Sequence, residues 1–374
     1  MKNYKILKIL PLYYSDLITN IYRDNPYLYQ LSYDEQKIFI NSQGFVHLNG
    51  FARCMNQLKN EATEIICDIE ILQKTWAKEN NKYYDEEFWS WQIVLHQINS
   101  IKPDIIYLQD IHPLPHIIRR QLKKDFPFIK LISMFKGFPS DPTELSDIDI
   151  LFAGIPPLQN HYYSLGYNSF LMYHCINPDI VNYQSDVVET DDPLYNFTFF
   201  GSSGFGTGGH HQKRYDTLFE LLKHTNITCW LSESENRNIS KTKDRPLSEI
   251  FADKTEPPKY GRELILGLRK SKLTFNIHTE KADGAIGNMR LFVATGAGTC
   301  LLTDSGHNVK DLFEPDKEIA TYQSLDECIE KATYLLSHDD LRRSIAKAGQ
   351  ERTLRDHSVM RRCEKIHEIF QEYL

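Results

Sequence analysis

Two series of alternating strand-like and helix-like segments constrain the fold of this chain more than any other feature. In the first half, apolar or β-branched runs predict strands over residues 4–9, 64–69, 104–108, 130–134, 148–153 and 169–174. In the second half, similar runs predict strands over residues 196–200, 227–231, 273–277, 299–303 and 318–322. Alternating β and α units produce parallel sheets covered by helices on both faces. The sequence therefore predicts an α/β protein with two Rossmann-like domains that face each other across a cleft.

Helical patterns lie between these strands. They are expected over residues 86–101, 115–126, 210–224, 262–270, 288–295, 308–313, 325–336 and 339–349. A polar, acidic stretch over residues 178–193 separates the two series and is typical of an interdomain linker. The expected parts are an N-terminal domain over residues 1–180, a C-terminal domain over 194–357 and a final helix within 358–374. Residues 232–258 are expected to form a long surface loop.

Composition excludes several classes of protein. The 43 Lys and Arg residues are outnumbered by 50 Asp and Glu residues, so the net charge of −7 argues against nucleic acid as the main partner. The 7 cysteines are odd in number and form no CxxC motif, which is typical of reduced core thiols. No His/Cys cluster has zinc-ligand spacing. No apolar stretch is long enough to span a membrane, and the N-terminus lacks signal-peptide features. We expect a cytoplasmic protein without a metal.

A glycine-rich segment, FFGSSGFGTGGHHQKR over residues 199–214, follows the first strand of the second series. Glycine lets backbone amides approach an anion, and the helix expected after it adds a partial positive charge. The candidate phosphate-binding residues here are Gly201, Ser202 and Ser203. A flexible loop and an acceptor loop remain open alternatives. A dinucleotide fingerprint is a further alternative, because Gly204, Gly206 and Gly209 satisfy GxGxxG. Glu233 lies farther along the chain than the usual ribose-binding acid, which weighs against that alternative.

The densest signal is HTEKADGAIGNMRLFVATGAGTCLLTD, residues 278–304. A strand delivers His278, and a loop with Gly284 and Gly287 leads into a helix that starts near Asn288. Arg290 lies in the first turn of that helix. Helix amides and a guanidinium together suit a diphosphate. The alternative is that Arg290 pairs with a carboxylate such as Asp304 or Glu280.

Candidate proton-transfer residues follow the strand over residues 104–108. Asp110 and His112 lie at its carboxyl end, where an imidazole or carboxylate could accept the proton of an acceptor hydroxyl. The alternative is a polar turn before the next helix. Lys136 ends another strand and could contact a phosphate or an acceptor, or lie in a surface loop. The Asp147–Asp149 pair matches DxD, but its place before an apolar strand favours a turn.

The second half of the chain resembles a known family. GNMRLFVATGAGTCLLTD, followed by VKDLFEPDKEIATYQSLDECIEKATYLLSHDDLRRSIAKAGQERTLRDHS, is similar to the C-terminal domain of GT-B glycosyltransferases, and specifically to the CgeB-like, spore-maturation-type domain. The resemblance implies two Rossmann-like domains and transfer of a sugar from a nucleotide sugar without a metal. It also implies a donor site in the C-terminal domain, with His278, Asn288, Met289 and Arg290 beside the diphosphate. The final helix would pack back on the N-terminal domain.

One position departs from that family. The family usually reads RLFEA, and its Glu commonly holds the donor ribose, whereas this chain has Val293. Glu280 or Asp304 could substitute for it. This departure motivates one alternative function, a non-catalytic relative that binds a nucleotide sugar or glycan. The other alternative, an NAD(P)-dependent oxidoreductase, rests on the GxGxxG match.

The resulting prediction is a metal-independent, hexosyltransferase-type enzyme that needs no cofactor. Its acceptor would be the hydroxyl of a glycan, a lipid-linked molecule or a protein. The expected catalytic residues are Asp110 and His112. The expected donor-binding residues are Gly201, Ser202, Ser203, His278, Gly284, Gly287, Asn288, Met289, Arg290 and Asp304.

Overall fold

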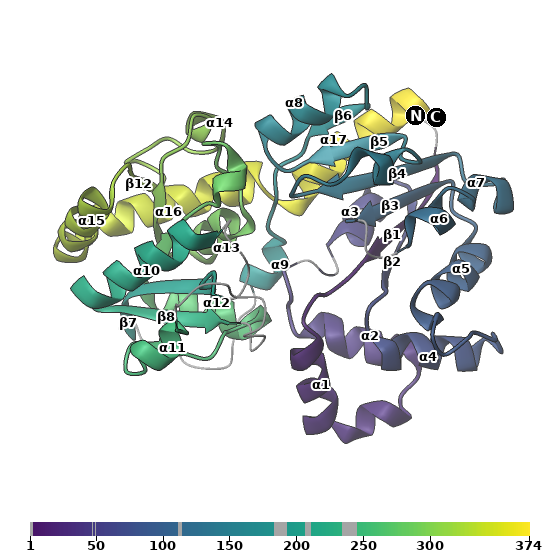
Figure 1. Ribbon diagram of the computed structural model, residues 1–374, viewed down its shortest axis with the longest axis horizontal. Coiled ribbons are helices and arrows are strands. Elements are labelled where there is room, and N and C mark those ends of the chain that lie inside the picture. The colour runs from purple at the N-terminus through teal and green to yellow at the C-terminus, as the bar shows by residue number, and fades with distance from the viewer. Residues whose placement is uncertain are drawn as a thin grey trace. The chain divides into compact units, whose positions relative to one another are not determined.

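The computed structural model describes residues 3–46, 48, 50–110, 114–182, 193–205, 211–233 and 245–374. The chain forms two compact units (Figure 1). Unit 1 comprises Met1–Gly154, Leu158–Met172 and Val359–Leu374, and unit 2 comprises Ile155–Pro157 and Tyr173–Ser358. Each unit contains a six-stranded sheet.

Unit 1 is built on a parallel sheet of order β2-β1-β3-β4-β5-β6. Its strands are β1 (Lys5–Leu10), β2 (Glu61–Ile66), β3 (Ile105–Gln109), β4 (Leu131–Lys136), β5 (Ile150–Ala153) and β6 (Ser169–Leu171). Strands β1 and β3 to β5 are almost continuously buried, as expected for a parallel sheet covered on both faces.

The helices of unit 1 connect these strands. They are α1 (Ser15–Asp24), η1 (Pro26–Gln30), α2 (Tyr33–Ser42), α3 (Phe51–Gln57), α4 (Glu70–Glu79), α5 (Trp89–Ile101), α6 (His116–Arg119), α7 (Leu122–Asp125), η2 (Pro142–Leu145) and α8 (Pro156–Ser164). The last helix, α17 (Val359–Tyr373), also belongs to unit 1 and packs on α3. Phe370 of α17 lies edge-on to Tyr4 and Phe152. His367 accepts hydrogen bonds at Nδ1 from the Tyr4 hydroxyl and from Asn60 Nδ2, at 2.8 and 3.1 Å.

Unit 2 has a second parallel sheet, of order β12-β11-β10-β7-β8-β9. Its strands are β7 (Tyr195–Ser202), β8 (Ile227–Ser232), β9 (Thr255–Glu256), β10 (Ser271–Asn276), β11 (Cys300–Asp304) and β12 (Ala320–Tyr322). Its helices are α9 (Pro178–Val181), α10 (Gln212–His224), α11 (Leu247–Ile250), α12 (Gly261–Arg269), η4 (Glu280–Ala282), α13 (Met289–Ala297), α14 (Val309–Leu312), α15 (Leu325–Ser337) and α16 (Asp339–Asp356).

Each sheet contains one place where the strand order reverses. In unit 1 this switch point lies between β1 and β3, and in unit 2 between β7 and β10. Connections leave such a point toward opposite faces of the sheet, so a crevice opens beyond the carboxyl ends of the two strands. Ligands of open α/β sheets bind there, so we expect a ligand site at these strand ends in each unit.

The predicted fold class is confirmed, and every strand expected from the sequence is present within a few residues. Several details were wrong. The single helix expected over residues 115–126 is two short helices, α6 and α7. The loop expected over residues 232–258 contains α11 and β9, and its residues 234–244 lie outside the described residues. In the expected linker, residues 178–181 form α9, whereas 183–192 lie outside the described part.

Trp230 is fully buried in the sheet of unit 2 and belongs to its core. Two expectations from the sequence, on the DxD match and on the cysteines, can also be compared with the structure. Asp147 accepts from Arg119 Nε at 2.9 Å in a turn before β5, which agrees with the turn interpretation of the DxD match. Six of the seven cysteines are buried, and Cys175 is half-buried.

Candidate functional site

At the switch point of unit 2, one glycine occupies a position that leaves no room for a side chain. Gly201, near the end of β7, has φ +126°, a conformation that side chains rarely adopt. A Cβ atom built there would lie 2.7 Å from Nη1 of Arg290. The sequence signal at Gly201 therefore reflects the close approach of a guanidinium from the neighbouring strand-helix connection.

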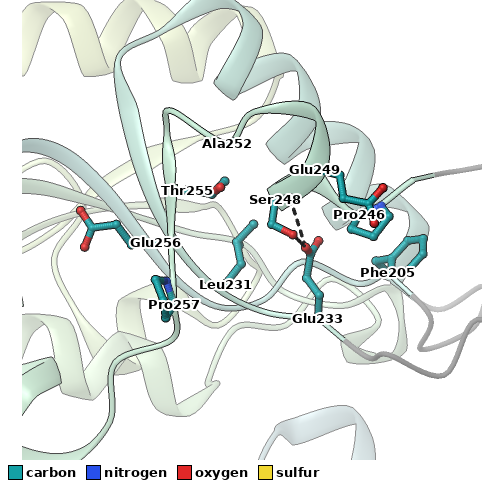
Figure 2. A pocket seen from close by; sticks show the side chains of 10 residues that line it. All are labelled: Phe205, Leu231, Glu233, Pro246, Ser248, Glu249, Ala252, Thr255, Glu256 and Pro257. Atoms are coloured by element: carbon teal, nitrogen blue, oxygen red, sulfur yellow. Dashed lines mark hydrogen bonds between the residues drawn. The ribbon is translucent and has the colours of Figure 1, made fainter.

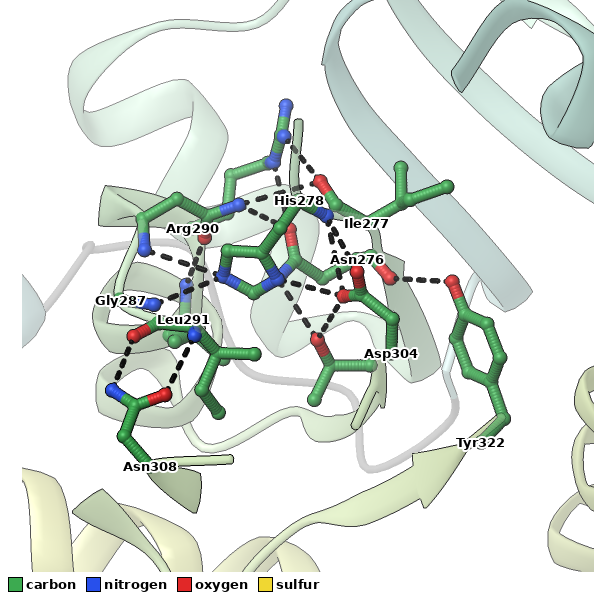
Figure 3. A network of polar contacts seen from close by, with 12 residues as sticks. Asn276, Ile277, His278, Gly287, Arg290, Leu291, Asp304, Asn308 and Tyr322 are labelled. Carbon is green, nitrogen blue, oxygen red and sulfur yellow. Dashed lines mark hydrogen bonds and ion pairs between the residues drawn. The ribbon is translucent and has the colours of Figure 1, made fainter. Parts of the chain in front are cut away.

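Arg290 is held at this point by neutral groups (Figure 3). Its Nε donates to Asn276 Oδ1 at 2.9 Å, and its Nη2 donates to the carbonyl of Ile277 at 3.0 Å. Its guanidinium lies 5.3 Å from the centroid of the Phe199 ring. Among the described residues no carboxylate forms an ion pair with it. The alternative interpretation, in which Arg290 pairs with Asp304 or Glu280, is wrong, and its positive charge is left without a salt-bridge partner.

A second guanidinium lies close to the first and was not singled out from the sequence. Arg214, on α10, is only 6% exposed, and Nη1 donates a long hydrogen bond of 3.4 Å to the carbonyl of Ser202. Its buried Nε has no hydrogen-bond partner among the residues described. Burial lowers the pKa of Arg214 to about 10, which the charge of Asp304 opposes. Burial and then the charge of Arg214 lower the pKa of Arg290. Both shifts come mainly from burial, and the charge of Asp304 opposes both of them. Within the described residues neither guanidinium forms an ion pair.

His278 does not face a ligand with free ring nitrogens. Its Nδ1 lies 2.7 Å from Asp304 Oδ1, and its Nε2 accepts from the amides of Gly287 and Asn288 at 3.1 and 3.3 Å (Figure 3). Because two amides donate to Nε2, the ring proton resides on Nδ1 and is donated to Asp304. Burial raises the pKa of Asp304, but electrostatic attraction to His278 and the hydrogen bonds from its ring and amide together lower that pKa below its usual range. The pair therefore orients the loop before α13.

This arrangement corrects the expectation that residues 284–290 present bare amides. The amides of Gly287 and Asn288 are used by His278, and that of Ile286 donates to Asn308 Oδ1 at 2.8 Å. Asn288 is the N-cap of α13, and its side-chain oxygen accepts from Leu291. Within the described part of the chain, the amides of Met289 and Arg290, the first two of the helix, have no acceptor.

The remaining predicted residues have varied surroundings. Gly284 has φ +72°, and its carbonyl accepts from the amide of His307 at 3.1 Å. Ser202 ends β7 beside Arg214, and its hydroxyl accepts from the amide of Gly204. Ser203 is fully buried, and its hydroxyl donates to Glu233 Oε1 at 2.7 Å. The structure thus brings most predicted donor residues to the ends of β7, β10 and β11.

A pocket of about 740 Å³ lies at the carboxyl end of β8 (Figure 2). The side chain of Glu233 points toward Ser248, and its oxygens accept from Ser203, the amide of Leu247, and the amide and hydroxyl of Ser248. The Ser203 bond therefore connects the pocket wall to the turn after β7. The pocket is lined by Phe205, Leu231, Glu233, Pro246, Ser248, Glu249, Ala252, Thr255, Glu256 and Pro257.

The candidate catalytic residues belong to unit 1. Asp110 follows β3 directly, at φ +76°, and its carboxylate pairs with the ammonium of Lys136 at the end of β4. Lys136 is 3% exposed, so the surface-loop interpretation of this residue is wrong. His112 lies outside the described residues, as do Gly206 and Gly209 of the GxGxxG match.

The described residues contain no group of three His, Cys, Asp or Glu side chains placed to hold a metal ion. None of the helices they form is both long enough and apolar enough to cross a membrane. Of the acidic residues considered for the ribose, Glu280 is exposed on η4 and Asp304 is committed to His278.

Comparisons with known proteins agree with this geometry. Residues 190–368 match a family model described as glycosyl transferase-like. A glycosyltransferase from Rickettsia africae has a TM-score of 0.58 at 12% identity, over 100% of this chain and 99% of that chain. HepE from Anabaena in complex with UDP-glucose has a TM-score of 0.61 at 10% identity, over 99% of this chain and 100% of that chain. This chain has the GT-B fold.

A third similar structure contains a nucleotide together with sugar-containing molecules. A TarM mutant from S. aureus, in complex with Fondaparinux, alpha-GlcNAc-glycerol and UDP, has a TM-score of 0.52 at 11% identity, over 75% of this chain and 59% of that chain. No curated protein was found to match this chain. The GT-B assignment therefore rests on fold and on the family match over unit 2.

Proposed function

We propose that this GT-B protein is a glycosyltransferase that moves a sugar from a nucleoside diphosphate sugar to an acceptor hydroxyl. The observation that carries this proposal is the pair Arg214 and Arg290 at the switch point of unit 2. Two guanidinium groups lie there, and no carboxylate of the described residues forms an ion pair with either one, although the charge of Asp304 acts on both. An uncompensated buried cation costs several kcal/mol, so such a pair is expected where an anionic ligand supplies the missing charge.

The chemistry of the leaving group fits this charge. When a glycosidic bond to a nucleoside diphosphate breaks, negative charge develops on the diphosphate oxygens. Guanidinium groups form charge-assisted hydrogen bonds with such oxygens, and the free amides of Met289 and Arg290 add the positive end of α13. Donors fixed in advance stabilise developing charge without reorganisation. We therefore propose that these groups act in place of a metal ion and that no cofactor is required.

The nucleoside would extend from the diphosphate toward the pocket at the end of β8. In Rossmann-like sheets the nucleoside lies over the strands on that side of the switch point. The pocket offers the Phe205 ring and two prolines as apolar walls. Val293 is 1% exposed and cannot reach ribose hydroxyls, so the family's usual ribose contact is replaced or missing in this chain.

The finer assignments follow the sequence resemblance. They are a CgeB-like subtype, hexosyl transfer, a cytoplasmic location, and a glycan, lipid-linked or protein acceptor. The related structures contain UDP-glucose in HepE, and UDP with alpha-GlcNAc-glycerol in TarM. In this chain Asp110 would accept the proton of the acceptor hydroxyl, since its carboxylate lies at a strand end and is positioned there by its ion pair with Lys136.

Titration of UDP and GDP tests the donor site by calorimetry. Loss of one charge-assisted contact costs about 1.5–3 kcal/mol, so Arg290→Ala should weaken binding by roughly ten- to hundredfold. Arg343→Ala removes an exposed arginine from the same unit and is the matched control, which should bind like the wild type. Equal affinity in Arg290→Ala and the wild type would remove Arg290 from the site.

A thermal-shift panel separates the proposal from its alternatives, because ligands stabilise the folded state. Nucleotide sugars should raise the melting temperature, whereas NADH should not. Stabilisation by NADH alone would favour an oxidoreductase. Donor binding with neither sugar transfer nor donor hydrolysis across a broad acceptor panel would identify a non-catalytic relative.

A further inference from the structure

We infer that His278 is a positioning residue of the donor site, which acts on the diphosphate through Arg290 and does not contact the donor itself. The inference rests on the proposed function, because it concerns how that site is held in place. It differs from the sequence resemblance, which implies that the His278 ring lies beside the diphosphate.

The imidazole of His278 is fixed at both of its nitrogens. Nδ1 donates to Asp304 Oδ1 at 2.7 Å, and the backbone amide of His278 donates to Oδ2 of the same carboxylate at 3.0 Å. Nε2 accepts from the amides of Gly287 and Asn288 at 3.1 and 3.3 Å. The residue is 8% exposed, and an imidazole has no polar atoms besides its two nitrogens. The ring therefore has no hydrogen-bonding group left for a phosphate oxygen.

The loop that His278 holds leads directly to Arg290. Asn288 caps α13 with its side-chain oxygen, which accepts from the amide of Leu291 at 3.3 Å. Its side-chain nitrogen donates to Asn276 Oδ1 at 3.0 Å, and Arg290 Nε donates to that same oxygen at 2.9 Å. One oxygen therefore fixes Arg290 relative to Asn288, and the backbone amide of Asn288 is fixed by His278.

Arg290 depends on neutral acceptors for its orientation. Its Nη2 donates to the carbonyl of Ile277 at 3.0 Å, which Asn288 Nδ2 also approaches at 3.4 Å. A hydrogen bond weakens when its distance or angle departs from the preferred range, so a shift of Asn288 would alter the direction of the guanidinium. The charge-assisted contact of Arg290 with a diphosphate would weaken as a result.

The alternative is that the ring blocks the two loop amides and that a phosphate displaces it. The contacts of the loop argue against displacement. Asn308 accepts from the amide of Ile286 and donates to its carbonyl, both at 2.8 Å, so the residue before Gly287 is held independently of the ring. Removing the ring would also leave the Asp304 carboxylate, whose side chain is 19% exposed, without the ring proton. Such a carboxylate is unfavourable beside a diphosphate.

A double-mutant cycle tests the inference, with the affinity for UDP measured by calorimetry. His278→Asn keeps a donor for Asp304 but removes the acceptor of the loop amides, so affinity should fall by roughly tenfold, the effect of one lost hydrogen bond. In the Arg290→Ala background the same substitution should cost less than about threefold, because the residue through which it acts is absent. His278→Gln places an oxygen near the position of Nε2 and should recover most of the affinity. His224→Asn changes an exposed histidine of the same unit and is the matched control.

A second measurement needs no ligand. The NMR signal of the Arg290 Nε–H group, assigned by its loss in Arg290→Ala, reports on the bond to Asn276. Its exchange with water should be faster by roughly fivefold in His278→Asn than in the wild type. Asn288→Ser keeps an N-cap but removes the nitrogen that donates to Asn276, so it should accelerate this exchange as well, whether or not His278→Asn folds.

The outcomes separate this inference from the proposed function. A full tenfold loss in the Arg290→Ala background would show that His278 contacts the donor directly, and tighter UDP binding in His278→Asn would show that the ring blocks the amides. Either result, or unchanged affinity and exchange in His278→Asn, overturns the inference and leaves the donor site in place. If UDP does not bind the wild type, the donor proposal fails, and the exchange of the Arg290 Nε–H group still decides whether His278 positions Arg290.

Discussion

The two switch points of this protein follow the same topological rule but carry opposite charge balance. In unit 1, the ammonium of Lys136 is matched by the carboxylate of Asp110. In unit 2, Arg214 and Arg290 lie near each other, and Asp304, the carboxylate whose charge acts on both, is hydrogen-bonded to His278. A balanced pair suits a neutral ligand and an unbalanced pair suits an anion. The comparison shows that sheet topology predicts where a ligand binds, whereas the balance of charged side chains at that place predicts the chemical class of the ligand.

The largest expected effect is a loss of stability when a buried arginine of unit 1, which is paired with a carboxylate, is replaced. Arg119 is 2% exposed and donates to Asp147 Oδ2, the carbonyl of Leu114 and the carbonyl of Glu144. Arg119→Met removes the arginine partner of the buried Asp147 carboxylate, which then retains His116, whose Nε2 lies 3.7 Å from Oδ1. We expect a loss of about 3–5 kcal/mol in the free energy of unfolding, measured by urea denaturation. A loss below about 1 kcal/mol would show that this ion pair is not needed.

The unbalanced arginine of unit 2 should behave differently. Arg214→Met removes a buried cation that forms no ion pair within the described residues, so the free energy of unfolding should stay the same or rise. Affinity for UDP should nevertheless fall by roughly ten- to hundredfold, or about 1.5–3 kcal/mol. Calorimetry and urea denaturation on the same variant measure both. Strong destabilisation together with unchanged UDP affinity would mean that Arg214 is a structural residue.

Alanine substitutions at two glycines distinguish the effect of backbone strain from the effect of displacing the Arg290 side chain. Gly201 and Gly166 both have positive φ, but a Cβ at Gly166 meets nothing within 4 Å, whereas at Gly201 it meets Arg290. Alanine at either position should cost about 1–2 kcal/mol of stability from strain. Only Gly201→Ala should also weaken UDP binding. If the Gly166→Ala control weakened UDP binding equally, the contact with Arg290 would not explain the effect.

The smallest expected effect is a pH dependence in unit 1. Burial lowers the pKa of His367, so the folded state holds the neutral ring, which accepts from Tyr4 and Asn60. The unfolded chain therefore binds more protons in the window just below the unfolded pKa of about 6.5. Stability should be complete above that value and fall by about 1 kcal/mol as the pH decreases through the folded pKa. Urea midpoints measured between pH 5 and 8 would show this slope.

A variant isolates the histidine. In His367→Asn, the side-chain oxygen replaces Nδ1 as the acceptor and does not titrate, so the slope near pH 6 should flatten. His224→Gln changes an exposed histidine of unit 2 and should leave the slope unchanged. A slope that persists in His367→Asn would assign it to another group.

Much of the fold could be predicted from the sequence, because parallel strands that are buried on both faces consist of short runs of apolar residues. β1 and β7 are examples, and both lie within two residues of their predicted ends. The helix ends were harder. A glycine usually stops a helix, but Gly349 lies inside α16, because a Cβ there would be 2.2 Å from the carbonyl oxygen of Glu318. The glycine serves packing between distant segments, which spacing along the chain does not reveal.

The candidate site was predictable only in part for the same reason. The segment around Arg290 was found, since a loop, a helix start and an arginine are adjacent in sequence. Arg214 was missed, because its partner lies 76 residues away and nothing local marks a buried arginine on α10. The use of the Gly287 and Asn288 amides by His278 was also missed. A hydrogen bond between a strand end and a following loop depends on geometry that composition cannot supply.

The return of α17 to unit 1 has a consequence for how the protein is made. The ribosome delivers residues 173–358, all of unit 2 except its first three residues, before it delivers α17. Until α17 is synthesised, Tyr4 and Phe152 of unit 1 lack their contact with Phe370, the side chain that packs against them. The half of the chain that is translated first is thus the half that is finished last, and a nascent chain halted before Val359 would expose an apolar surface to chaperones.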